Sequence, residues 1–143
     1  MIVLLRLWRY GWALPVTLLG LMLWRIACVS GGSASRVDGV LEVCGGWPAR
    51  VLVRGFLFSG PVAAITLGHV VLGVSTGELE RTRAHERVHV KQFERWGGLM
   101  LVLYPLAGVW AWARGGDAYR DNWFEREARA GESRPRSWRN QRP

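Results

Sequence analysis

The chain has 143 residues, of which half are apolar and nine are tryptophan. Its formal net charge is +8, and 18 of its 19 basic residues are arginine. This length allows one domain with a modest core. No basic stretch is interleaved with stacking aromatics, whereas basic residues flank apolar runs, so we expect an anionic membrane surface as partner and no nucleic acid. Cys28 and Cys44 lack C-x-x-C spacing and predict neither a thiolate zinc site nor a disulfide.

Residues 1–30 predict a membrane anchor helix. The uncharged run 10–24 rises only about 22 Å as a helix, which is short of the ~30 Å hydrocarbon core. Arg9 and Arg25 can reach the two interfaces by snorkelling. The alternative is a cleaved signal sequence, or a lipoprotein-type site at Cys28. We favour a retained helix, because Arg25 stands where small residues should precede a cleavage site.

The segment that follows predicts a few short strands. Residues 31–35 are rich in glycine and serine and predict a flexible linker at a domain boundary. Residues 37–44 alternate loosely and predict a strand that ends in a turn at 45–46. Residues 50–58 fit either a second strand or a short helix. Residues 63–74 combine β-branched residues with interrupting glycines and predict one buried strand.

Residues 75–97 predict one long helix. Ser75 and Glu78 form a capping-box pattern at its start, and Gly97 is typical of a left-handed stop. At about 100° per residue, one face is predicted to point inward and the other to be solvated. The inward face comprises Thr82, His85, His89, Gln92, Phe93 and Trp96, and the solvated face comprises Glu80, Arg83, Arg87, Lys91 and Glu94.

The inward face carries the pattern H-E-x-x-H as His85, Glu86 and His89. Histidines four residues apart lie one above the other on a helix, so they can offer two imidazole nitrogens to one zinc ion. Glu86 directly follows the first histidine and is placed to take a proton from a zinc-bound water. The alternative is a chance pattern with two hydrogen-bonded core histidines. The helix signals on both sides favour the metal site.

Catalytic zinc usually has three protein ligands and a water, so a third ligand is needed. The metzincin continuation requires glycine and histidine where Gln92 and Arg95 stand, and the chain has no fourth histidine. The best candidate lies in residues 121–128, DNWFEREA, which predict a second short helix. His69, on the predicted strand before the motif helix, could face the site. A lone histidine on an apolar strand is more often structural.

The two motifs together resemble the gluzincin branch of the zincin metallopeptidases, in which H-E-x-x-H is followed by a helix with glutamate, often as E-x-x-A. They are also similar to small bacterial membrane proteins with H-E-x-x-H-x-x-Q and N-x-F-E-x-E-A. The similarity covers residues 68–130. It implies that His85, His89 and Glu125 are zinc ligands and that Glu86 is the general base.

The chain departs from this family at Arg129, where an aspartate that braces a zinc ligand commonly follows the alanine. Two alternatives stand beside the assignment of Glu125. Asn122-x-x-Glu125 is a capping-box-like pattern, so Glu125 could cap its own helix, and Glu127 is a second candidate ligand. Gln92 could hydrogen-bond a ligand or substrate, or be a plain buried amide.

Residues 99–113 are apolar throughout. A single crossing of the membrane here would separate the histidines from Glu125, and 15 residues are too few for a hairpin that returns to the same side. We therefore expect this segment to pack against the motif helix or to lie in the membrane interface. The basic residues 131–143 predict a disordered tail.

The sequence thus predicts an α+β fold, in which an N-terminal membrane helix (1–30) precedes a small, mostly helical zincin-like domain (31–130) with a few short strands before the H-E-x-x-H helix. The expected function is that of a zinc-dependent metallopeptidase anchored in the bacterial cytoplasmic membrane, acting on a peptide or protein substrate. The alternative is a non-catalytic metal-binding or scaffold membrane protein.

Overall fold

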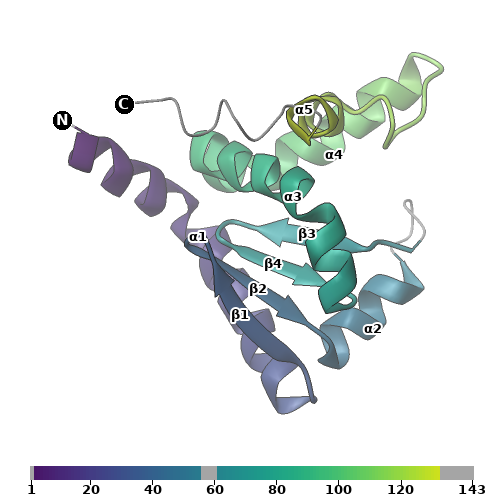
Figure 1. Ribbon diagram of the computed structural model, residues 1–143. Coiled ribbons are helices and arrows are strands. Elements are labelled where there is room, and N and C mark those ends of the chain that lie inside the picture. The colour runs from purple at the N-terminus through teal and green to yellow at the C-terminus, as the bar shows by residue number, and fades with distance from the viewer. Residues whose placement is uncertain (1, 56–60, 133–143) are drawn as a thin grey trace.

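A four-stranded sheet lies between helices in the computed structural model, which describes residues 2–55 and 61–132 (Figure 1). The α+β class is confirmed, as is the N-terminal apolar helix. The elements are α1 (Ile2–Val29), β1 (Ser33–Val37), β2 (Val40–Cys44), α2 (Gly46–Arg54), β3 (Ala64–Leu67), β4 (Val70–Gly73), α3 (Thr76–Trp96), a 3₁₀ turn η1 (Gly97–Leu99), α4 (Met100–Ala113) and α5 (Trp123–Glu132).

The sheet consists of two hairpins, in the strand order β1-β2-β4-β3. β1 pairs antiparallel with β2, and β3 pairs antiparallel with β4. The hairpins join through the parallel pair of β2 and β4. Asp38 and Gly39, with φ of 49° and 80°, turn the first hairpin, and Gly68, with φ of 62°, lies in the turn of the second. Asp-Gly is a common pair in such two-residue turns.

Three sequence predictions are corrected by this topology. The linker at 31–35 is wrong, because β1 begins at Ser33 and pairs with β2. The single strands predicted at 37–44 and 63–74 are each interrupted by a hairpin turn. For residues 50–58, the sequence left strand or helix open, and the structure shows a helix, α2, which ends at Arg54. Residues 56–58 lie outside the described residues.

Helix α1 packs with one face against the sheet. Ala13, Val16 and Ala27 are buried on this face, within a cluster that includes sheet residues Val43 and Val70. The glycine at position 20 permits close approach, because a Cβ added there would lie 2.7 Å from the Cβ of Val70. The opposite face of α1 leaves apolar side chains exposed.

Helix α3 covers the other face of the sheet, and both of its predicted ends are confirmed. The Ser75 hydroxyl accepts a hydrogen bond from the amide of Glu78, and Gly97 ends the helix with φ of 56°. The predicted solvated face is corrected. Arg83 and Arg87 lie against the sheet and bind the buried carboxylate of Glu42, because α3 has the sheet on one side and α5 on the other.

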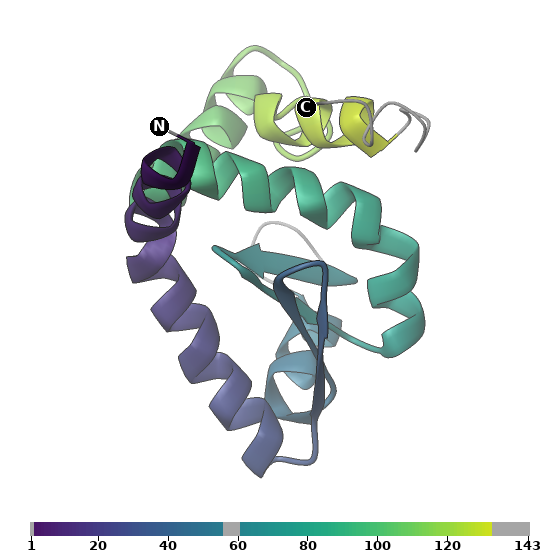
Figure 2. The same cartoon turned by 60° about the vertical axis from the view of Figure 1, so that its left-hand side comes forward.

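After Gly97 the chain changes direction, and α4 leads to α5, which packs against α3 (Figure 2). Gly11–Val29 and Thr76–Ala113 are each long and apolar enough to cross a membrane by length and composition. The second stretch includes the break at Gly97. In the predicted tail, residues 131 and 132 end α5, and 133–143 lie outside the described residues.

The ion pairs of Glu42 give a first prediction. Replacing Glu42 with alanine leaves Arg87, whose side chain is 17% exposed, without its carboxylate partner. Removing one partner of a buried pair is strongly destabilising, and we expect a loss of about 3 kcal/mol in the free energy of unfolding. Glu80, an exposed glutamate on the helix that carries Arg87, serves as the control. The Glu80→Ala variant should change the free energy of unfolding by less than about 0.5 kcal/mol. Urea unfolding followed by circular dichroism in mild detergent measures both, and equal values would contradict the prediction.

Candidate metal centre

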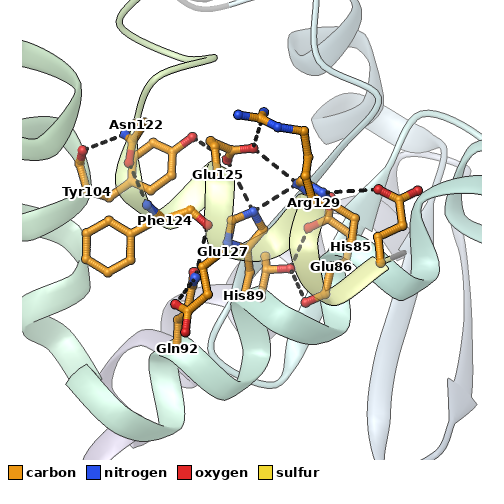
Figure 3. A network of polar contacts seen from close by, with 12 residues as sticks. His85, Glu86, His89, Gln92, Tyr104, Asn122, Phe124, Glu125, Glu127 and Arg129 are labelled. Carbon is orange, nitrogen blue, oxygen red and sulfur yellow. Dashed lines mark hydrogen bonds and ion pairs between the residues drawn. The ribbon is translucent and has the colours of Figure 1, made fainter. Parts of the chain in front are cut away.

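Side chains from α3 and α5 converge where these two helices pack against each other (Figure 3). His85 and His89 project from α3, and their Nε2 atoms lie 3.1 Å apart. Glu125 reaches them from α5. Its Oε2 lies 3.2 Å from Nε2 of His85, and its Oε1 lies 3.2 Å from Nε2 of His89. One ligand atom from each residue falls within 4.8 Å of the others, so the three can hold a metal ion.

Asn122 and Tyr104 settle the orientation of Glu125. The Asn122 side chain accepts a hydrogen bond from the amide of Phe124 and so caps α5. Glu125 is therefore not required as a cap, and its carboxylate points toward α3. The Tyr104 hydroxyl donates to Oε1 of Glu125 at 2.7 Å. The other oxygen, Oε2, is buried and lies 3.2 Å from Nε2 of His85 and 3.9 Å from Nη1 of Arg129.

This arrangement of polar atoms fits a metal ion. A buried carboxylate is costly unless donors or a cation compensate its charge. The two oxygens of Glu125 each face one imidazole nitrogen: Oε2 lies 3.2 Å from Nε2 of His85, and Oε1 lies 3.2 Å from Nε2 of His89. Two nitrogens and one carboxylate oxygen form a common donor set for divalent transition metals in proteins.

Gln92 fixes which nitrogen of His89 is available. Its amide nitrogen donates to the carbonyl oxygen of Phe124 at 3.0 Å and to Glu127 at 2.8 Å. Both partners are acceptors, so the amide oxygen of Gln92 must face Nδ1 of His89, which lies 2.8 Å away. Nδ1 then carries the proton of the neutral ring, and the lone pair lies on Nε2, which faces Glu125.

The electrostatics of the cluster favour positive charge. Burial raises the pKa of Glu125, but hydrogen bonds from His85 and His89 outweigh burial and hold that pKa well below its usual range. Burial lowers the pKa of His89, but the carboxylates of Glu125 and Glu86 outweigh it and leave the pKa above its usual value. A site that attracts a proton in this way also attracts a divalent cation, which competes with the proton for the same nitrogen.

Glu86 lies beside the cluster and lines an open pocket of about 380 Å³. The hydroxyl of Thr66, from the edge strand β3, donates to Oε2 of Glu86 at 2.6 Å and so orients the carboxylate. The lining also includes Ala64 of β3, His85 of α3, Arg129 of α5, and Tyr119 of the loop between α4 and α5. A small polar group bound at the cluster would therefore lie next to a carboxylate.

The remaining residues singled out from the sequence lie in other places. His69 is in the turn between β3 and β4, where its ring contacts Thr17 of α1 and Glu94 of α3. Glu127 does not join the three possible ligands and binds Gln92 instead. Arg129 lies with Nη1 3.9 Å from Oε2 of Glu125.

Sequence analysis did not identify Thr66 or Tyr104 as site residues. Neither belongs to a motif, and each reaches the site from an apolar segment. A signal was present for Tyr104, since it is the single residue with a side-chain hydroxyl in the uncharged run 99–113. Comparisons of the chain with protein-family models, curated proteins and solved structures find no match.

The hydrogen bonds of Gln92 give a prediction about metal affinity. In a Gln92→Ala variant, His89 loses the acceptor that fixes its tautomer, and such outer partners typically contribute 10- to 100-fold to metal affinity. We expect zinc affinity to fall by roughly that factor in a competition titration with a chelating indicator. The exposed neighbour Lys91, replaced by alanine, serves as the control. Unchanged affinity in Gln92→Ala would show that the amide does not support His89.

Proposed function

We propose that this chain is a membrane-associated, zinc-dependent metallopeptidase of the gluzincin type. The observation that carries the proposal is the convergence of His85, His89 and Glu125. Glu125 lies at least 36 positions after either histidine in the sequence. The buried carboxylate of Glu125, which faces the Nε2 atoms of both histidines, and the available Nε2 of His89 support a metal at this point. Zinc suits this N, N, O donor set.

The chemistry proposed is hydrolysis of a peptide bond. Zinc, when bound, polarises a carbonyl oxygen and lowers the pKa of water toward ~7. Glu86 then acts as general base and acid: its carboxylate accepts a proton from the attacking water and returns it to the nitrogen of the leaving amine. The hydroxyl of Thr66 holds Oε2 of Glu86 and so keeps the carboxylate oriented during both transfers.

Strand β3 supports an extended peptide as the substrate. It is the edge strand of the sheet, and no strand within residues 2–55 and 61–132 pairs with its outer side. The amide of Val74 donates to the carbonyl of Ala63, so Ala63 and Ile65 direct their main-chain groups toward β4. The main-chain groups of Ala64 and Thr66 therefore point to the free edge, where an extended peptide can pair.

The proposed location is the bacterial cytoplasmic membrane. The stretch Gly11–Val29 has the length and composition of a membrane span, and the basic residues suit an anionic leaflet. The contact of Glu125 with both histidines supports a course in which residues 99–113 do not cross the bilayer, since a crossing would separate them.

One observation favours a second candidate, a scaffold without catalysis. Arg129 stands where the gluzincin pattern has an aspartate, and its guanidinium lies 3.9 Å from Glu125. A cation at this distance competes with a divalent ion for the same carboxylate. In this alternative, the polar cluster joins α5 to α3 by ion pairs alone.

Zinc content separates these two candidates. We expect one zinc ion per chain in the detergent-purified protein, and loss of most of it in His89→Ala and Glu125→Gln, because each variant removes one of the three proposed protein ligands. Glu127→Gln, which alters a nearby carboxylate outside the cluster, should retain the metal. Elemental analysis by mass spectrometry makes the measurement. Absence of zinc from every form after reconstitution would support the scaffold.

The role of Glu86 is tested by Glu86→Gln. The amide keeps the shape and the contact with Thr66 but cannot accept the proton, so peptide hydrolysis should fall at least about 100-fold while zinc content stays the same. Quenched fluorescent peptides in detergent micelles provide the assay. Hydrolysis at the wild-type rate with metal retained would exclude Glu86 as the base.

A further inference from the structure

Helix α4 has two faces of different exposure but the same apolar composition. At about 100° per residue, its exposed side chains occupy one half of the helix surface and its buried ones the other. The outer face of α4 consists of Leu101, Val102, Pro105, Leu106, Val109, Trp110 and Trp112. Its large side chains are exposed from 48% at Leu101 to 70% at Trp112. A helix face that meets water normally carries charged or polar residues, and this one carries none.

The other half of α4 is fixed to the domain. Met100 is buried in the main core, and Tyr104 binds Glu125. A Cβ added at Gly108 would lie 2.9 Å from the carbonyl oxygen of Ala118, so the chain after α4 packs tightly on this side. Rotation of α4 to hide its outer face would break these contacts. Within residues 2–55 and 61–132, the outer face therefore stays uncovered.

Helix α4 is too short to cross a bilayer. Its 14 residues rise about 21 Å, against a hydrocarbon thickness of ~30 Å. Its two ends also lead to α3 and α5, which pack against each other through His85, His89 and Glu125. Both ends thus belong on the same side of a membrane, and the helix can enter lipid only along the membrane plane.

The flanks of α4 suit an anionic lipid surface. The Arg114 guanidinium lies 5.6 Å from the ring centre of Trp110, and Arg95, before the turn into α4, lies 5.3 Å from that of Trp96. Tryptophan and arginine at the ends of an apolar face are typical of helices at the membrane interface. The chain as a whole carries a net charge of +8, which complements anionic headgroups.

We propose that the outer face of α4 is a docking surface for an anionic bilayer, into which it inserts without crossing. The apolar surface continues through Leu99, which is 52% exposed, to Trp12, which contacts Gly97. Because Tyr104 binds Glu125 from the opposite side of the same helix, lipid docking places the metal cluster about one helix diameter, ~10 Å, from the membrane surface. The proposal rests on the exposed apolar face, on its flanking charges and on the packing of α5 against α3, and it stands whether or not the cluster is catalytic.

Vesicle flotation of the full chain tests the proposal. The vesicles contain phosphatidylglycerol with phosphatidylcholine, or phosphatidylcholine alone. The variant Leu106→Gln with Val109→Gln removes apolar surface from α4, and Leu18→Gln with Met22→Gln removes a matched amount from the exposed face of α1. We expect the α4 variant to lose roughly tenfold or more in partitioning into the anionic vesicles and the α1 variant to lose much less. Thermal melting in detergent confirms that both variants fold.

Wild-type binding by the α4 variant would overturn the proposal, and so would equal losses in the two variants. Unchanged vesicle binding with a shift from dimer to monomer in detergent would assign the face to a second copy of the chain instead. If the glutamines prevent folding, brominated lipid provides the test. The double variant Trp110→Phe with Trp112→Phe should lose more of the lipid quenching of tryptophan fluorescence than the control variant Trp47→Phe. Trp47 is an exposed tryptophan on α2. Equal quenching in both would overturn the proposal.

Discussion

The contact between the carboxylate of Glu125 and the two imidazoles of α3 holds the helical half of the molecule together. Glu125 is only 2% exposed, and burying an ionised carboxylate is unfavourable unless hydrogen bonds and opposite charge compensate. His85, His89 and Tyr104 supply that compensation from two other helices. The same contact therefore fixes α5 on α3, determines the return of the chain through α4, and assembles the only three-residue ligand group found in the described residues.

Helix α3 is held by charged groups on both of its sides. Toward the sheet, Arg83 and Arg87 bind Glu42 of β2. Toward α5, His85 and His89 meet Glu125. Because the motif residues alternate with residues that bind the sheet, the histidines cannot move along the helix axis without loss of the Glu42 ion pairs. The sheet thus positions the polar cluster although it contributes no ligand to it.

The sequence allowed the local features of the fold to be predicted, because they depend on neighbouring residues. The cap at Ser75, the stop at Gly97 and the shared face of His85 and His89 are examples. The two hairpin turns were not predicted, because the short pairs Asp-Gly and Gly-His lie within apolar runs that also fit one longer strand. Glu125 came from resemblance to a family and not from spacing. The contacts of Thr66 and Tyr104 depend on long-range packing, which no local pattern encodes.

The break at Gly97 decides whether Glu125 can reach the two histidines at all. Without it, Thr76–Ala113 could form one straight rod of 38 residues, about 57 Å long, and carry α5 away from the motif. A φ of 56° suits glycine, and a Cβ there would lie 2.5 Å from Nε1 of Trp12. One hydrogen atom in place of a side chain thus separates a hinged pair of helices, with a closed polar centre, from a straight helix with its charged groups far apart.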